Sequence, residues 1–340
     1  MLPDTFFMKT ILITGGAGFI GSHLAEAILK VGGRVIVFDN FDYSRFIGPN
    51  DYNEFIRSQC SAQSYQCHCI KGDINDKSMI QEAISTWQPD IIVHLAAIAD
   101  SVFALQFPEM CQQVNVCGVK NVLDACKQCS TLEKFVFVSS SYVYGDFLYD
   151  PVDELHPLRP QHIYGITKRE GERLTEEFCE RYGVAYTIVR PTAVYGFGSR
   201  ENRVCSKMIN DALTDRRIIL YNGGNDRLDF THIDDLINAC MTLLTRDSVE
   251  NEIVNISRGC VRYISELAEI VRMRIPDTHI VHATGDFKRP KRGELDISKM
   301  QRLLHFTPRI DLEEGIEMLI NEIEHMRGTN DSLVTTMYRG

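Results

Sequence analysis

Three glycines, each three residues from the next, separate a short apolar run from a helical pattern near the start of the chain. Residues 10–14 are β-branched or apolar, and residues 19–30 repeat apolar side chains with the period of a helix. Gly15, Gly18 and Gly21 fall in the turn between the two. Glycine permits a tight turn and lets backbone amides approach a pyrophosphate, whose charge a helix N-terminus favours. This spacing predicts an opening βα unit shaped for a dinucleotide.

The same alternation continues to about residue 190. Further apolar runs lie at 34–39, 90–96, 134–140 and 185–190, and helical patterns lie at 78–84, 114–129 and 162–182. Runs that are apolar on both faces and separated by amphipathic helices are typical of a parallel sheet covered on both sides. We therefore predict an α/β fold with a doubly wound parallel sheet.

A smaller second region is predicted after residue 190, where the elements become shorter and mixed. Helical patterns recur near 203–214, 233–245, 263–274 and 311–326. We predict a sheet domain at 1–190, to which segments near 229–258 return. A partly interleaved substrate-binding region at 191–340 would cap the carboxyl edge of the sheet, where such folds bind ligands. The last dozen residues have no clear periodicity and are expected to form a mobile tail.

The composition narrows the function classes. The net charge of −10 and a single short basic cluster at 288–294 argue against a nucleic-acid partner. No apolar run reaches the roughly 18 residues of a membrane span, and the first residues lack a signal-peptide pattern. The 11 cysteines have no regular spacing, which favours free thiols over a disulfide framework or a metal site. We expect a cytoplasmic protein with neither a membrane nor a nucleic-acid partner, and without a metal.

Asp39 ends the second predicted strand, 18 residues after Gly21. An acidic residue at this place hydrogen-bonds both ribose hydroxyls of an adenosine and repels a 2′-phosphate. It therefore favours NAD over NADP, although Arg45 is close enough in sequence to leave NADP open.

Tyr164 and Lys168 are four residues apart in a predicted helix, so both side chains lie on one face. A phenol with a pKa of about 10 is a poor base at neutral pH, but a neighbouring ammonium and a cationic nicotinamide ring both favour the phenolate. Because a predicted dinucleotide turn lies upstream, Tyr164 is a candidate general base.

Several segments occur in the order and spacing of one enzyme family: TGGAGFIGSHL, HLAAIA, SSSYVYG, YGITK, RPTAVYG and DFTHIDDL. From about residue 9 to about 325, the chain resembles the extended short-chain dehydrogenases/reductases, and more narrowly their NAD-dependent nucleotide-sugar epimerases and dehydratases. The resemblance implies a Rossmann-type domain that binds NAD and a C-terminal region that binds the diphosphate of a nucleotide sugar. It also implies a homodimer formed by the helices at about 109–129 and 162–182.

The resemblance assigns roles to single residues. Ser140 would bond the reacting sugar oxygen, Tyr164 would take its proton, and Lys168 would bond the nicotinamide ribose. The residues that it places along the cofactor, from the pyrophosphate to the adenosine and the ring, are Gly15, Gly18, Phe19, Ile20, Gly21, Asp39, Asn40, Asp73, Ile74, Leu95, Ala96, Ala97, Asn115, Tyr164 and Lys168.

The residues after Ser140 bear on the reaction. Members of the family first oxidise the sugar at carbon 4, and the dehydratases then eliminate water with an Asp-Glu pair that directly follows the catalytic serine or threonine. Those positions are Ser141 and Tyr142 here, and the related decarboxylases usually have a glutamate at the second. The resemblance therefore implies a 4-epimerase with a transient 4-keto intermediate. A 4,6-dehydratase with a relocated acid, a decarboxylase or a 4-keto reductase remains the alternative, and a non-enzymatic NAD-binding protein is disfavoured by the intact catalytic set.

The substrate is expected to be a nucleotide-diphosphate sugar, most simply a UDP-sugar. Ala193 and Leu228 stand where the family often has an asparagine and an arginine that serve the diphosphate. Neutralisation of the phosphates is therefore expected from Arg227 or Arg292, because a guanidinium fork suits a diphosphate. Ser141 and Tyr142 complete the predicted substrate-binding set.

Overall fold

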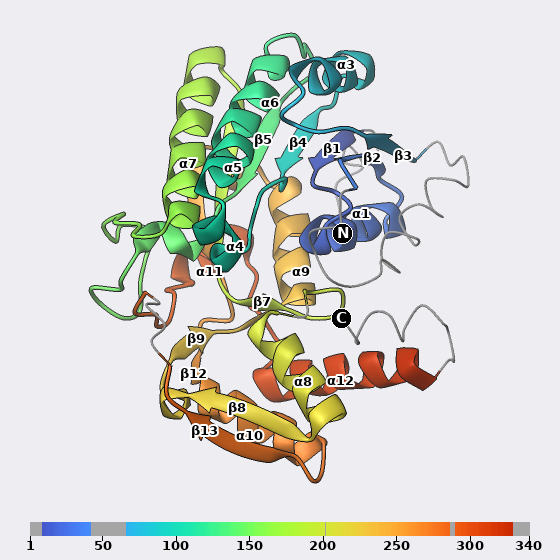
Figure 1. The fold of residues 1–340 in the computed structure, drawn as a ribbon. Coiled ribbons are helices and arrows are strands. Elements are labelled where there is room, and N and C mark those ends of the chain that lie inside the picture. The colour runs from blue at the N-terminus through green and yellow to red at the C-terminus, as the bar shows by residue number, and fades with distance from the viewer. Residues whose placement is uncertain (1–8, 42–65, 201, 286–289, 329–340) are drawn as a thin grey trace.

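The large sheet forms the centre of the upper part of the molecule in Figure 1. The computed structural model describes residues 9–41, 66–200, 202–285 and 290–328, so the predicted tail and Arg45 lie outside the described residues. Seven strands pair in parallel in the order β11-β6-β5-β4-β1-β2-β3. They are β1 (Thr10–Thr14), β2 (Arg34–Asp39), β3 (Cys67–Lys71), β4 (Ile91–His94), β5 (Lys134–Val138), β6 (Ala185–Pro191) and β11 (Glu252–Ile256). The predicted α/β fold class is confirmed.

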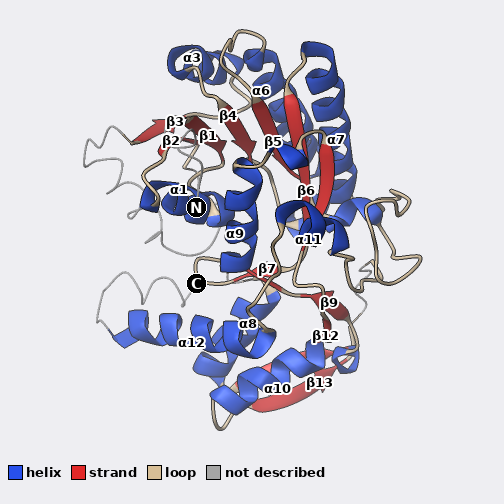
Figure 2. Cartoon of the chain, turned by 180° about the vertical axis from the view of Figure 1, so that it is seen from behind, coloured by secondary structure: helices blue, strands red, loops and turns tan. Residues whose placement is uncertain are grey.

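Helices cover both faces of this sheet because successive strand residues point to opposite sides. In β1, Ile11 and Ile13 enter one core and Leu12 enters the other. The first core includes α1 (Phe19–Lys30), α9 (Ile233–Leu244) and α11 (Ser298–Leu304), and α9 and α11 lie in front of the sheet in Figure 2. The second core includes α3 (Lys77–Trp87), α6 (Val119–Cys126) and α7 (Ile163–Tyr182).

Short elements follow the carboxyl ends of β4 and β5. After β4 come α4 (Ser101–Gln106), α5 (Pro108–Gln112) and a π-helical segment, η2 (Gln113–Gly118), which leads into α6. After β5 comes one 3-10 turn, η3 (Ser141–Tyr144). These segments lie at the edge of the sheet where ligands of doubly wound folds bind.

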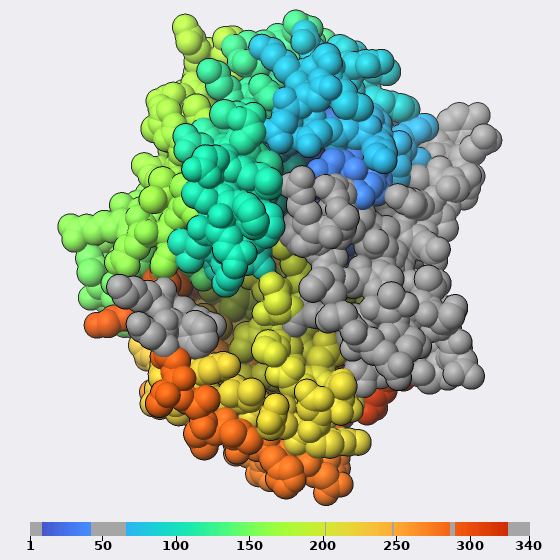
Figure 3. Space-filling view, viewed as in Figure 1, coloured from blue at the N-terminus to red at the C-terminus, as the bar shows by residue number. Residues whose placement is uncertain are grey.

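The smaller region has its own core, to which α8 (Val204–Asp215), α10 (Ile264–Arg274) and α12 (Leu312–Gly328) contribute. Three two-stranded sheets complete it: β13–β8 (His279–Ala283 and Arg217–Tyr221), β12–β9 (Val261–Tyr263 and Arg227–Asp229) and β10–β7 (Thr231–His232 and Val194–Tyr195). In the view of Figure 3, the blue-to-green segments lie above the yellow-to-orange ones. We keep the division into 1–190 and 191–340 as a proposal. Helix α9 and strand β11, both within 229–258, lie with the large sheet.

Strand β3 was missed by the sequence analysis. Its residues are mostly half-buried at the edge of the sheet, so they show no continuous apolar run. The expectation of free thiols holds for several cysteines of the described chain, such as Cys126, Cys205 and Cys240. It is wrong at Cys69, which is disulfide-bonded. Within the described ranges, no helix combines the length and the hydropathy that crossing a membrane requires.

Candidate active site

The glycine turn between β1 and α1 is shaped by close backbone contacts. Gly15 has a φ of +70°, and a Cβ there would lie 2.6 Å from the backbone nitrogen of Ala96. A Cβ at Gly21 would lie 2.2 Å from the carbonyl oxygen of Gly15. Only glycine satisfies both positions without moving the backbone, because other residues rarely adopt this φ and a side chain would fill the turn.

This turn fits the pyrophosphate of NAD. Helix α1 begins at Phe19 after Gly18, which has no side chain to cap it, and its first turn contains no acidic residue. The first amides of a helix, here including those of Phe19 and Ile20, have no intrahelical acceptor and carry the positive end of the helix dipole. An anion that approaches the turn therefore meets backbone donors and a favourable field.

Asp39 lies at the end of β2, beside the glycine turn. Its Oδ2 accepts a hydrogen bond from the Ala17 amide at 3.0 Å, and its Oδ1 accepts one from the Phe41 amide at 2.9 Å. Burial raises the pKa of this carboxyl, these backbone donors oppose the rise, and the charge of Asp73 adds to it. Asp39, its neighbour Asn40 and Asp73 thus lie on the side of the turn where the adenosine is predicted. The side chain of Ile74 instead lies in the core against Gly118, which leaves only its backbone for an adenine.

The segment after β4 lies against the turn. The Leu95 amide donates to the Thr14 carbonyl at 3.0 Å, and the backbone of Ala96 packs on Gly15. Leu95, Ala96 and Ala97 are therefore placed along the predicted cofactor path. Asn115 is buried, its Oδ1 accepts from the Ile98 amide at 2.7 Å, and its Nδ2 donates to the Ile98 carbonyl at 3.1 Å. Its approach to the cofactor stays a prediction.

The same Asn115 Nδ2 also lies 3.1 Å from the Thr167 hydroxyl and 3.3 Å from the Cys111 sulfur. This amide is fully engaged inside the protein, so we interpret Asn115 as a support that ties the segment after β4 to helix α7. Asn115 lies in the π-helical segment η2, and such segments are frequent at functional sites.

Ser140, Tyr164 and Lys168 lie together at the carboxyl end of β5. Ser140 caps η3, with its Oγ accepting from the Tyr142 amide at 3.2 Å, and it also hydrogen-bonds Tyr164. Tyr164 and Lys168 are both buried on α7, and the Lys168 Nζ donates to the Val138 carbonyl at 2.7 Å. The residues that the sequence analysis singled out as catalytic thus form one contiguous group.

The charges of this group differ from the simple expectation of a phenolate beside an ammonium. Burial raises the pKa of Tyr164, and the hydrogen bond from Ser140 and the charge of Arg203 oppose that rise. Burial also lowers the pKa of Lys168 to about 8, against the opposing effects of Cys111 and Glu172. In the protein alone, therefore, desolvation favours the neutral form of both groups.

Arg292 reaches this group from the smaller region. Its Nη1 donates to the Ser141 carbonyl at 2.9 Å and lies 3.3 Å from the Ser141 hydroxyl. Its guanidinium lies 4.1 Å from the centre of the Tyr142 ring, and that ring meets Tyr164 edge to face at 5.4 Å. Arg292 is thus beside the catalytic group, together with Ser141 and Tyr142.

Arg227 is not brought to the catalytic group. It is half-exposed, and its Nη2 lies 2.8 Å from the Oδ2 of Asp150. The Oδ1 of Asp150 accepts from the Glu294 amide at 2.8 Å, so Arg227 lies near the segment that carries Arg292. Its predicted role at the diphosphate stays a prediction.

A set of residues in the loop between β7 and α8 was not predicted from the sequence. Asn202 Nδ2 donates to Asp100 Oδ2 at 2.6 Å, and Arg203 Nη2 donates to the Ala99 carbonyl at 2.8 Å. Arg200 Nη1 lies 3.9 Å from the same Asp100 carboxylate, and its charge and that of Tyr164 act on each other. The sequence signal was the arginine pair in SRENR, which begins at Ser199 and is separated from RPTAVYG by two residues.

Comparison with known proteins gives a consistent result. Residues 11–257 match the model of the NAD dependent epimerase/dehydratase family. A Methanocaldococcus jannaschii protein, provisionally named a UDP-glucose 4-epimerase, is 32% identical over 330 residues, which are 94% of this chain and 100% of that protein. UDP-glucuronate 4-epimerase 4 of Arabidopsis thaliana is 27% identical over 335 residues, which are 92% of this chain and 74% of that protein.

Among solved structures, the chain is similar to UDP-glucuronic acid 4-epimerase from Bacillus cereus, crystallised in complex with UDP-glucuronic acid and NAD. The two have a TM-score of 0.84 and 28% sequence identity, and the match covers 93% of this chain and 99% of that one.

Proposed function

The chain belongs to the NAD-dependent epimerase/dehydratase family, and from this membership we propose that it is a nucleotide-sugar 4-epimerase. The observation that carries the proposal is the contiguous group of Ser140, Tyr164 and Lys168. The two residues that follow Ser140 in the sequence have no carboxyl group. NAD is its cofactor, and the glycine turn and Asp39 are the residues that would hold it.

In the proposed reaction, Tyr164 takes the proton of the hydroxyl at carbon 4 of the sugar. Ser140, already hydrogen-bonded to Tyr164, bonds the same oxygen and orients it. Bound NAD supplies the hydride acceptor and donor. Lys168 follows Tyr164 by one turn of α7, and its ammonium would lower the free energy of the phenolate that develops there. The 4-keto sugar turns in the cleft and is reduced on its other face, which returns the proton from Tyr164.

The two residues after Ser140 support epimerisation over dehydration. Elimination of water needs an acid at the leaving hydroxyl, and Ser141 and Tyr142 supply none. The nearby Asp100 is already engaged, since its Oδ1 caps α4 and its Oδ2 accepts from Asn202. A dehydratase would have to free this carboxylate or bring another to the sugar.

We propose that the substrate is a UDP-sugar, and that its sugar carries an acid group. The Tyr164 phenol interacts electrostatically with three arginines, Arg200, Arg203 and Arg292. In the proposed reaction, the sugar would lie with its reacting end at this phenol. Cationic groups at that end favour a hexuronate over a neutral hexose, because a carboxylate there is attracted to all of them. Relatives of the chain include enzymes named for each of these substrates.

We also propose a homodimer and a cytoplasmic location. Helices α4 and α7 pack on each other and expose apolar side chains, with Val102 61%, Leu105 55% and Ile166 46% exposed. A second copy would remove this surface from water. Ile166 lies in the predicted helix at 162–182, whereas Val102 and Leu105 lie before the one predicted at 109–129. The cytoplasmic location is proposed from the sequence, whose 11 cysteines have no regular spacing; the disulfide at Cys69 argues against a reducing compartment.

The test is incubation of the purified protein with UDP-glucose, UDP-N-acetylglucosamine, UDP-glucuronate and GDP- and CDP-sugars, with products identified by NMR. We expect interconversion of one pair of 4-epimers without net consumption of reduced cofactor. Tyr164→Phe should lose activity by about 10²- to 10⁴-fold while still binding NAD. A 4-keto-6-deoxy product, or stoichiometric use of NADH, would replace the proposal by a dehydratase or a reductase.

A further inference from the structure

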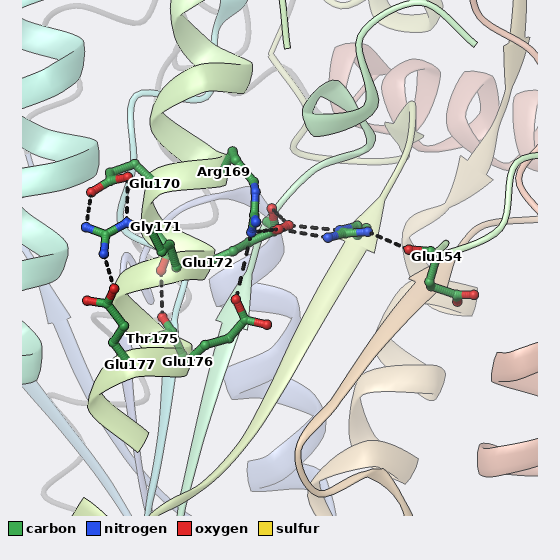
Figure 4. A network of polar contacts seen from close by, with 11 residues as sticks. Glu154, Arg169, Glu170, Gly171, Glu172, Thr175, Glu176 and Glu177 are labelled. Carbon is green, nitrogen blue, oxygen red and sulfur yellow. Dashed lines mark hydrogen bonds and ion pairs between the residues drawn. The ribbon is translucent and has the colours of Figure 1, made fainter. Parts of the chain in front are cut away.

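A buried ion pair lies directly behind the catalytic group. Glu172 of α7 and Arg190 of β6 are 0% and 1% exposed, and they meet in a two-point contact: Nε to Oε1 at 2.9 Å and Nη2 to Oε2 at 2.8 Å. Figure 4 shows Glu172 at the centre of a network that also includes Arg169, whose Nη1 is 3.4 Å from Oε2. A pair this well buried and this well formed is unusual among charged residues.

The pair holds both ends of the segment that contains Ser140. On one side, the Ser139 hydroxyl donates to Glu172 Oε1 at 2.6 Å. On the other side, Arg190 Nη1 donates to the Tyr144 hydroxyl at 3.1 Å, and that hydroxyl donates to Asn255 of β11 at 2.7 Å. Residues 140–143, which include the proposed catalytic serine, are therefore fixed between two anchors that share one ion pair.

Helix α7 reaches the end of β5 with two side chains one turn apart. Lys168 bonds the Val138 carbonyl, and Glu172 bonds the hydroxyl of the next residue, Ser139. The close approach that allows this occurs at Gly171, where a Cβ would lie 2.4 Å from the Phe137 ring. The catalytic lysine and the buried carboxylate are thus held at consecutive positions of one strand end.

Stability alone does not account for the pair. Replacing a buried ion pair with apolar residues of similar volume is often neutral or stabilising, because desolvation offsets the attraction between the charges. The groups that interact electrostatically with the buried Lys168 ammonium come from several elements: His94 of β4, Cys111 of α5 and Glu172 of α7. Glu172 is the carboxylate of this set, and its charge favours the protonated lysine.

We propose that the Glu172–Arg190 pair is a positioning unit for the reaction, which holds the Ser140 segment from both sides and supplies the negative charge that faces Lys168. Arg190 fixes the carboxylate, and Glu172 acts through Ser139 and Lys168 without touching the substrate. This inference rests on the roles proposed above for Ser140, Tyr164 and Lys168.

The test compares Glu172→Gln with wild-type holoenzyme. We expect kcat to fall by about tenfold or more, with KM for the sugar nucleotide changed by less than about threefold, because substrate binding does not involve the pair. The titration of Lys168 is followed by NMR of lysine-labelled protein, and its signal is assigned with Lys168→Met. We expect its midpoint to move to lower pH, at an about tenfold higher proton concentration. Glu170→Gln is the matched control, since Glu170 lies on the same helix but pairs with Arg173 at the surface.

The double variant Glu172→Gln/Arg190→Met separates positioning from mere neutralisation of Arg190. It leaves no unpaired buried charge, so we expect thermal stability to recover while kcat and the Lys168 titration stay displaced. Recovery of all three, or a Glu172→Gln enzyme with unchanged kcat and unchanged titration, would overturn the proposal. The titration needs no substrate, so a wild-type protein that epimerises nothing would refute the proposed function without deciding this inference.

Discussion

Lys168→Met should stabilise the NAD-free protein at neutral pH while removing its activity. Lys168 is 4% exposed, and burial lowers the pKa of this lysine from 10.5 to about 8. In the unfolded chain the ammonium is hydrated and keeps its ordinary pKa. A charged lysine at this site therefore opposes folding at pH 7.

The sign follows from proton counts. Below about pH 8 Lys168 is protonated in both the folded and the unfolded state. The folded state then bears the full cost of burying the ammonium, which is about 3 kcal/mol for a pKa that falls from 10.5 to about 8. Between these values the unfolded state binds more protons, so the free energy of unfolding rises with pH. From pH 7 to 9.5 the gain attributable to Lys168 is about 2 kcal/mol. His94, which faces Lys168, adds nothing in this range, because burial holds its pKa at about 3.

The assay is denaturant unfolding of wild type and Lys168→Met at pH 7, 8, 9 and 9.5, both freed of NAD. The free-energy difference between the two proteins should narrow by about 2 kcal/mol over this range as wild type gains stability. Lys207→Met, at an exposed position of α8, controls for loss of a lysine as such. A difference that stays constant with pH would refute the reasoning that desolvation dominates at Lys168.

Other substitutions test other parts of the site. Gly15→Ala should abolish NAD retention after purification, because its Cβ would clash with Ala96 and its φ of +70° would be strained. Gly183→Ala is the control: its φ is +69° but the space around it is open, so it should keep NAD and lose only about 1 kcal/mol of stability. Arg200→Met should lower kcat/KM for UDP-glucuronate at least about tenfold more than for UDP-glucose, measured in parallel assays; equal losses would remove the argument for an acidic sugar. Ile166→Glu, at a 46% exposed position of α7, should give a monomer by light scattering, and an unchanged mass would rule out this dimer face.

Local patterns predicted most of the sheet domain. The glycine turn, the strands that begin at residues 10, 34, 91, 134 and 185, and the helix with Tyr164 and Lys168 all depend on short-range periodicity, which the sequence displays directly. Strand β3 escaped because a half-buried edge strand lacks a continuous apolar run.

The site was predictable where residues follow strand ends, and less so where distant segments meet. Arg292 was expected at the diphosphate, yet it bonds Ser141, 151 residues earlier, and stacks on Tyr142. The raised pKa of Tyr164 was likewise not predictable, because it depends on burial, which is a property of the folded chain and not of the Tyr-Lys spacing. Glu172 was not singled out from the sequence, because its partners are Ser139, which follows β5, and Arg190 of β6.

Because Arg292 contacts a residue far earlier in the chain, the parts of the site are synthesised at different times on the ribosome. At roughly 5 to 20 residues per second, the 151 residues between Ser141 and Arg292 take roughly 8 to 30 s to synthesise. At the start of that interval the glycine turn and the strands from β1 to β5 have already been translated, and β6 follows within it, whereas the guanidinium that stacks on Tyr142 is translated only at its end. All residues proposed to hold the nucleotide cofactor are therefore translated before the arginine that completes the proposed pocket for the sugar.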